Sequence, residues 1–439
     1  MGMTVNSVYM LADAAFVGRW AGTMALAGLT ITFPIVMCAL GLSQLAGVGA
    51  ASIVSRCLGA GDQRKAERAA GTSVTLSLIL GVAFGALGSL FLHPVLRGFG
   101  AMDDVLPYAA DYMRIVFPGS VLFIATLSAM NVVRAEGAIR RAVIATLISC
   151  LLNLGLDPLL IGPFGMGIKG AAYAWLIGQV AGAIYMTHFC LSKASILHVR
   201  LGDLKPDREC LAEALHIGSS SFTRVAAGSL GFIVLNHSIA AYGDEAHLAI
   251  MGIANRLVTF ALLPIIGLSH GLQPILGFNF GAGDMRRVRA ALRVATTAGS
   301  AMSASGCVLM IVFAPVLVSL FSSDPEVQAV GPSILRTLVT MFWLVGFQTV
   351  AVCLFQSLGK AVPALVLSLF RQVFALVPLM LLLPLWLGLR GVWLSYPAAD
   401  AIAATLTVGL LFREIRQLGR PVITARPDAG PWTGSDAPA

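Results

Sequence analysis

Long apolar runs recur about every 35 residues along this chain, and they constrain its fold more than any other feature. Each run is long enough to cross the ~30 Å hydrocarbon core of a bilayer as a helix. Hydrophobic residues make up 57% of the 439 residues and charged residues only 11%, a composition outside the range of water-soluble globular proteins. The runs lack the period-two alternation of a membrane β-barrel, so the sequence predicts an all-α integral membrane protein.

The apolar runs give twelve candidate transmembrane helices, at 1–20, 25–56, 66–97, 105–134, 139–162, 168–192, 210–241, 247–277, 286–320, 327–357, 362–387 and 391–416. The long polar connection in the middle separates two sets of six. This predicts an N-terminal lobe over 1–192, a cytoplasmic linker over 193–209 and a C-terminal lobe over 210–417. The remainder, 418–439, is rich in Pro, Gly and Ala and is expected to be a disordered tail.

The first predicted helix is short. Only 18 residues precede Arg19, and these reach about 27 Å as a helix. A first helix that is clipped at its start is therefore expected.

Basic residues are divided unequally between the two sets of predicted loops. Twenty lie after the even-numbered spans, whereas four lie on the opposite side, at Arg19, Arg97, Lys169 and Arg390. Because Lys and Arg collect in cytoplasmic loops, both termini are expected in the cytoplasm and the protein in the cytoplasmic (inner) membrane. The same distribution accounts for the net charge of +8 without nucleic acid as a partner.

An internal repeat relates the two halves. The segment Leu58–Lys65 recurs as Phe280–Arg287, and its Asp62 maps onto Asp284 with an offset of 284 − 62 = 222. Gly137 maps onto Gly359 with the same offset. Each half has an even number of spans, so the two have the same topology and are related by an axis along the membrane normal. Alternating-access transporters are built in this way, with a cavity between the halves.

One acid lies deep within an apolar run. Asn153 and Asp157 are four residues apart, so they share one face of a helix, and Pro158 frees a carbonyl beside them. A carboxylate at this depth costs ~2.5–3.5 kcal/mol on insertion scales. The repeat places Ala375 and Leu379 at the equivalent positions. Because the polar pair exists in one copy only, a functional cation or proton site is favoured over a structural role.

Several motifs, in order, resemble those of the multidrug and toxic compound extrusion (MATE) transporters, with the DinF-like branch most similar. They are Asp13–Arg19, Leu58–Lys65, Arg134–Gly137, Asn153–Pro158, Phe355–Lys360 and Arg371–Gln372. The resemblance extends from about residue 5 to residue 417. It implies twelve helices in two lobes, and export of drug-like, often cationic compounds in exchange for protons or sodium.

The resemblance also assigns a site. In the family a first-helix Asp and a fifth-helix Asn and Asp form a cation or proton site, and Asp13, Asn153 and Asp157 match these positions. Members that bind sodium there often have a sixth-helix Thr where this chain has Trp175, which favours protons. Protonation of the acids and binding of substrate are then expected to favour opposite facing states.

Secondary polar candidates are less distinct. Asn6 lies two helical turns before Asp13, where it could line the site or pack helices. Gln179 and Asp400 are repeat partners with an offset of 221. Asp400 could be a second functional acid or the ion-pair partner of Arg371, and Arg371 could alternatively contact an anionic substrate.

Other functions lack the residues they need. The sequence has no Walker A motif, no HExxH and no GxSxG, so neither an enzyme nor an ATP-driven pump is expected. Its seven cysteines show no metal-binding spacing, and no cofactor is expected beyond the coupling ion. The expected partners are a small-molecule substrate and membrane lipid, with the chain as a monomer. The alternative is a flippase for lipid-linked precursors, which requires a large cationic cavity for a pyrophosphate.

Overall fold

The computed structural model describes residues 16–243, 245–322 and 324–418. The described elements of the N-terminal half are η1 (Val17–Ala21), α2 (Thr23–Gly59), α3 (Gln63–Leu90), α4 (Leu92–Gly98), α5 (Leu106–Ala135), α6 (Ile139–Ile161) and α7 (Ile168–Leu191). The connection contains η2 (Leu201–Leu204). The second half contains α8 (Arg208–Tyr242), α9 (Glu245–Gly281), α10 (Met285–Val312), α11 (Ala314–Ser319), α12 (Pro325–Val339), η3 (Phe342–Leu344), α13 (Val345–Ser357), α14 (Ala361–Leu369), η4 (Phe370–Leu376), α15 (Val377–Leu387) and α16 (Leu389–Leu418).

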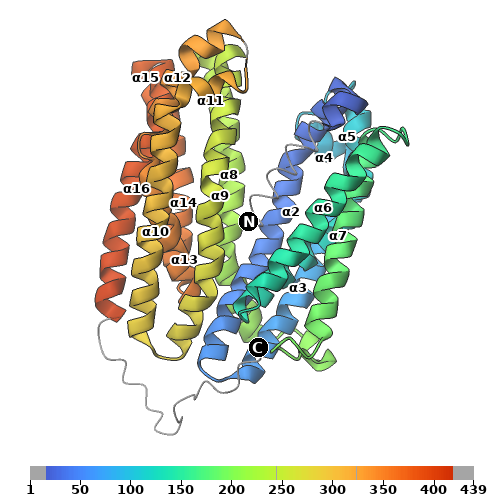
Figure 1. The fold of residues 1–439 in the computed structure, drawn as a ribbon, viewed down its shortest axis with the longest axis vertical. Helices are drawn as coiled ribbons and strands as arrows, with labels where there is room; N and C mark the ends of the chain where they lie inside the picture. The colour runs from blue at the N-terminus through green and yellow to red at the C-terminus, as the bar shows by residue number, and fades with distance from the viewer. Residues whose placement is uncertain (1–15, 244, 323, 419–439) are drawn as a thin grey trace.

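The helices gather into two bundles, which we call the N-terminal bundle (α2–α7) and the C-terminal bundle (α8–α16) (Figure 1). Within the described residues, ten helical segments are long and apolar enough to cross a membrane. The predicted span 210–241 forms the 35-residue helix α8, which packs against α2 and α14 but is not among those ten. The predicted first span lies mainly outside the described residues, as does the predicted tail after 418.

The internal repeat is visible in the backbone. Helix α3 maps onto α10 end for end with the offset of 222, and Asp62 and Asp284 each cap their helix by accepting a backbone N–H bond. Gly137 and Gly359 both have positive φ, 95° and 74°. An L-residue side chain is strained in that conformation, so the repeated glycines preserve the same turn in both copies.

The copies differ in two places. The single helix α5 corresponds to α12, η3 and α13, because the second copy is interrupted between Thr340 and Leu344. The single helix α6 corresponds to α14, the π-helical segment η4 and α15. Such π-helical segments are often found at functional sites, and this one contains Arg371 and Gln372.

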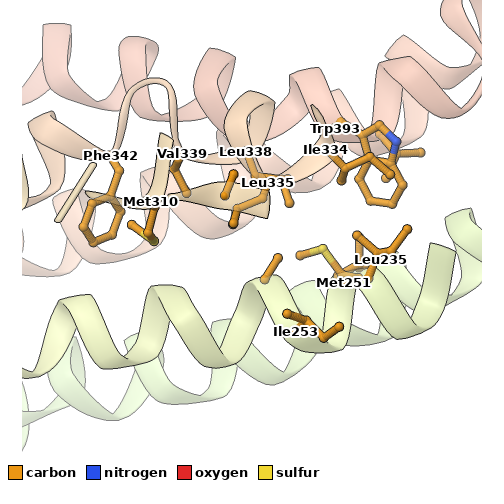
Figure 2. Packing of buried hydrophobic residues seen from close by; sticks show 14 of the residues in the cluster. Leu235, Met251, Ile253, Met310, Ile334, Leu335, Leu338, Val339, Phe342 and Trp393 are labelled. Carbon is orange, nitrogen blue, oxygen red and sulfur yellow. The ribbon is translucent and has the colours of Figure 1, made fainter. Parts of the chain in front are cut away.

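The largest apolar core lies in the C-terminal bundle. Leu235 of α8 and Ile250 of α9 pack there against residues of α10 and α12. Figure 2 shows Met310 of α10, Leu335 of α12 and Trp393 of α16 in the same cluster. Many apolar side chains elsewhere are exposed, Leu90 and Trp386 among them. For helices of this length and hydropathy, exposed apolar side chains are expected where lipid covers the protein.

The two bundles touch at one end and diverge toward the other (Figure 1). Helix α2 packs against α8 and α9. A Cβ atom at Gly49 would lie 2.0 Å from the Ala214 carbonyl oxygen, and one at Gly281 would lie 1.9 Å from the Arg56 oxygen. The bundles therefore close at the end carrying most of the basic loops, the side on which charge placement predicts the cytoplasm.

Candidate functional site

Asn153 and Asp157 lie together on α6 and are buried, with 3% and 0% exposure. With the Asn153 amide oriented so that both of its ends are bonded, its Nδ2 donates to Asp157 Oδ2 at 2.8 Å. Its oxygen accepts the backbone N–H of Trp175 on α7, also at 2.8 Å. The predicted pair thus forms one hydrogen-bonded unit between two helices, away from water.

Glycines on α7 allow this close approach. A Cβ atom at Gly178 would lie 2.6 Å from the Ser149 carbonyl oxygen and one at Gly182 would lie 2.3 Å from Ser149 Oγ. The Trp175 ring turns the other way, toward Phe123 of α5, with ring centroids 5.6 Å apart. Trp175 therefore contributes its backbone to the Asn153–Asp157 pair, and its side chain fills the N-terminal bundle.

Asp13 and Asn6 lie outside the described residues. The chain is first described at Phe16, whose ring stacks on Trp20 with centroids 5.3 Å apart. Val17 is fully buried, and η1 contacts both α6 and α7. The segment that follows Asp13 in sequence thus packs against the two helices that hold the Asn153–Asp157 pair.

The remaining predicted polar residues lie in other places. Asp400 is buried and forms an ion pair with Arg371, with Nε 2.5 Å from Oδ1. Gln348 donates to the Asp400 backbone oxygen at 3.0 Å. Gln179 lies half-buried on α7 and forms no hydrogen bond with either site within the described residues. The structure therefore brings Asn153 to Asp157 and Arg371 to Asp400.

Three basic residues at the junction of the bundles were not recognised as a group from sequence. His270 of α9 lies close enough to Arg134 of α5 and Arg224 of α8 for both charges to act on it. Arg134 ends the predicted span 105–134, and it occupies the last turn of α5, where it donates to Asn131 Oδ1 at 2.6 Å. The offset of 222 maps Arg134 onto Gln356, another residue at this junction. That correspondence is the sequence feature that could have indicated the position of Arg134 at the junction.

The connection between the bundles is fixed by two buried carboxyl groups. Glu136 Oε2 accepts from Ser195 Oγ at 2.9 Å and from the backbone N–H groups of Ile196 and Leu197. Burial raises the pKa of Glu136, and these three donors offset part of the rise. Asp203 accepts from the Arg200 N–H, which is the largest cause of its lowered pKa, and pairs with Arg64 at 2.9 Å.

No cluster of three or more His, Cys, Asp or Glu residues able to hold a metal occurs in the described part of the chain. The Asn153–Asp157 pair offers oxygen and amide groups only. Chemically, it can bind and release a proton or hold a small cation.

The sequence matches the MatE family model over residues 1–159 and 221–381. The chain belongs to the MatE family. Members are membrane transporters, so this protein is a transporter and not an enzyme, and its fold is the all-helical MATE fold. The finer assignment to the DinF-like branch stays a prediction.

The relatives of this MATE transporter match nearly its full length. The "Multidrug export protein MepA" of Staphylococcus aureus (strain MRSA252) is 27% identical over 414 residues, covering 94% of this chain and 91% of that protein. The protein of the same name from Staphylococcus haemolyticus is 26% identical over 412 residues, with 94% and 90% covered.

Solved structures of transporters also match the fold of this chain over nearly its full length. One, described as the "outward-facing conformation of a multidrug resistance MATE family transporter of the MOP superfamily", has a TM-score of 0.90 and 28% identity, covering 95% of this chain and 93% of that one. A second, from Pyrococcus furiosus, has the same score and identity and covers 95% and 94%. Its description states that the "reverse polarity" of its binding pocket suggests a different function.

Proposed function

We propose that this MATE transporter exports small organic compounds in exchange for protons, with sodium as the less favoured coupling ion. The observation that carries the proposal is the burial of Asp157, at 0% exposure, against the amide of Asn153. An ionised carboxylate in such a site is costly, and a group of this kind is kept when it takes up a proton or ion. The multidrug-export names of the relatives supply the substrate class.

The orientation of Asn153 supports protons over sodium. Its oxygen is engaged by the Trp175 N–H, so the amide presents N–H groups to Asp157. Hard cations prefer oxygen ligands, and an N–H donor disfavours such an ion beside it. Asp13 is proposed to complete the site, because the segment after it packs against α6 and α7.

The two lobes, 1–192 and 210–417, are proposed to act as domains that rock about the linker 193–209. Protonation of Asp157 removes a charge and a strong acceptor from the N-terminal bundle. If the protonated form favours one facing state and bound substrate favours the other, each ligand drives the release of its counterpart. We infer a monomer in the cytoplasmic membrane with both termini in the cytoplasm.

The test is transport in proteoliposomes under a proton gradient alone and under a sodium gradient alone. A panel of fluorescent organic compounds of positive, negative and zero charge keeps the assay independent of substrate class. We expect transport driven by the proton gradient. Transport driven only by sodium would overturn the choice of ion. Movement of a lipid-linked pyrophosphate with neither gradient would favour the flippase.

A further inference from the structure

Arg134, Arg224 and His270, which we call the basic cluster, come from both bundles. Arg134 belongs to the N-terminal bundle and is partly exposed. Arg224 and His270 belong to the C-terminal bundle; Arg224 is exposed and His270 is partly exposed. The charges that act on His270 come from the two arginines, and no described carboxylate is among them. Arg224 has no hydrogen bond or ion pair among the described residues.

The face of α9 that carries His270 is covered at one end only. Toward the cytoplasm, Gln273 donates to the Val48 oxygen at 3.4 Å, and Gly277 and Gly281 lie against α2. Residues at helical spacing in the outward direction continue the same face. There Arg256 is exposed, and a Cβ atom at Gly267 would meet nothing within 4 Å. His270 therefore lies where the contact between the bundles ends and the uncovered face begins.

Helix α8 places Arg224 at the same depth in the protein as His270. One turn toward the cytoplasm, Gln356 Nε2 donates to Ser220 Oγ and Ser221 Oγ, each at 2.9 Å. Ser52 of α2 in turn donates to the Gln356 carbonyl oxygen. These hydrogen bonds join the two bundles one helical turn from Arg224 on its cytoplasmic side. They would close off that side of a ligand bound at Arg224.

Acidic residues deep in the bundles are already engaged or lie elsewhere. Asp157 is enclosed within the N-terminal bundle, Asp400 is bound to Arg371, and Glu213 is bound to Arg56 at 2.7 Å. An arginine without an anion inside a membrane protein is costly, and such residues mark substrate pathways. The guanidinium fork matches carboxylate and phosphate groups, which it can bind through two parallel hydrogen bonds.

We propose that the substrates of this transporter carry an anionic group, a carboxylate or a phosphate, which binds between the bundles to Arg134, Arg224 and His270. This inference rests on the proposed export function and specifies its substrate class. Because the cluster draws on both bundles, relative movement of the bundles changes the separation of Arg134 and Arg224. The affinity for the anion then differs between the two facing states.

Equilibrium binding without any gradient tests the proposal. Purified protein in detergent is titrated into carboxyfluorescein, an anionic probe, and into ethidium, a cationic probe, with fluorescence polarisation as the readout. We expect carboxyfluorescein to bind more tightly than ethidium. Arg224→Gln should weaken carboxyfluorescein binding about tenfold, the scale of one charge-assisted contact. Arg224→Lys keeps the charge and should retain more binding than Arg224→Gln.

Arg114→Gln is the matched control. Arg114 lies on α5 with Arg134, twenty residues before it and therefore ~30 Å away along the helix, and it pairs with Asp111 at 3.5 Å. Its substitution should leave probe binding unchanged. Size-exclusion profiles establish that each variant is folded. Equal loss in Arg114→Gln and Arg224→Gln, or tight binding of ethidium alone, would overturn the assignment.

The anionic group could belong to a soluble organic acid or to a lipid, and two competition arms separate these sources. Benzoate represents the first and dioctanoyl phosphatidylglycerol the second. Displacement of carboxyfluorescein by either one supports the anion site and names its source; displacement by neither contradicts it. A failed proton-driven assay with intact probe binding in the parent protein would reject the coupling alone, and proton-driven transport of cations alone would reject only the substrate class.

Discussion

At the scale of single residues, the sequence predicted the Asn153–Asp157 pair because residues four apart on a helix lie next to each other on one face. It also offered the ion pair as one explanation of Arg371 and Asp400, which the structure joins. It could not predict that Asn153 bonds the backbone of Trp175, because that contact depends on how closely Gly178 lets α7 approach α6. The basic cluster was missed because its members come from α5, α8 and α9.

Replacement of Asn153 by Ala removes the N–H bond to Asp157 and the acceptor for the Trp175 N–H. A buried group left without its partner costs ~1–3 kcal/mol. We expect a lower melting temperature in detergent and slower proton-driven export. Asn279→Ala is the control, since Asn279 is at the C-terminal end of α9, away from the pair, and its amide donates to the Ile275 oxygen. A variant as stable and active as the parent would show that the pair contributes nothing.

Arg371→Leu breaks the ion pair with Asp400, whose side chain is 4% exposed. Loss of one partner from a buried pair costs ~3–5 kcal/mol, whereas replacement of both by apolar residues is often neutral. Thermal unfolding should show a large loss in Arg371→Leu and a substantial recovery in the Arg371→Leu, Asp400→Leu double variant. If the double variant is no more stable than the single one, the pair is not the reason for the loss.

At the scale of elements, the offset of 222 predicted corresponding helices because a duplicated chain repeats its caps and glycine turns. It could not predict η4 or the break before α13. The π-helical segment surrounds Arg371 and Gln372, two polar residues in an apolar run, and two residues give no periodic signal. The linker between the bundles was expected as a polar connection only, yet buried carboxyl groups attach it to the N-terminal bundle.

Asp203→Asn tests how this linker is held. The pKa of Asp203 is lowered below its ordinary value of 3.8, first by the Arg200 N–H and then by Arg64. A lowered pKa means that the ionised carboxylate stabilises the fold, so its contribution is present above pH 3.8 and is lost as the pH falls. The variant should melt lower than the parent at pH 7, and the difference should shrink below pH 4.

Asp103→Asn, in an exposed pair with Arg97, is the control and should melt like the parent at both pH values. A difference between Asp203→Asn and the parent that grows on acidification would contradict the assigned direction of the pKa shift.

At the scale of the whole molecule, repeat and charge placement predicted two bundles of like topology in one membrane orientation. They could not predict which end of the bundles closes. That depends on tertiary approach at glycines such as Gly49 and Gly218, which the sequence presents as ordinary helix glycines. The closed end lies on the side of the basic loops, so the bundles open on the opposite side, which the proposed orientation places outside the cell.

Gly49→Ala tests the closed end. The added methyl would lie 2.0 Å from the Ala214 backbone oxygen, so α2 and α8 must separate. We expect the outer ends of the bundles to approach each other as the cytoplasmic contact loosens. Spin labels at Asp104 and Ser319 would report this as a shorter distance. Gly409→Ala, where a Cβ atom meets nothing within 4 Å, should leave the distance unchanged; an unchanged distance in Gly49→Ala would contradict the closure described.

The central claim is that Asp157 couples protons to export, and uphill transport by Asp157→Asn beside the parent tests it most directly. Both proteins are reconstituted with equal internal and external substrate, and a proton gradient is imposed. The account predicts that the parent accumulates substrate against its gradient, whereas Asp157→Asn, folded by its size-exclusion profile, accumulates none. Accumulation by Asp157→Asn at the parental rate and extent would contradict the account.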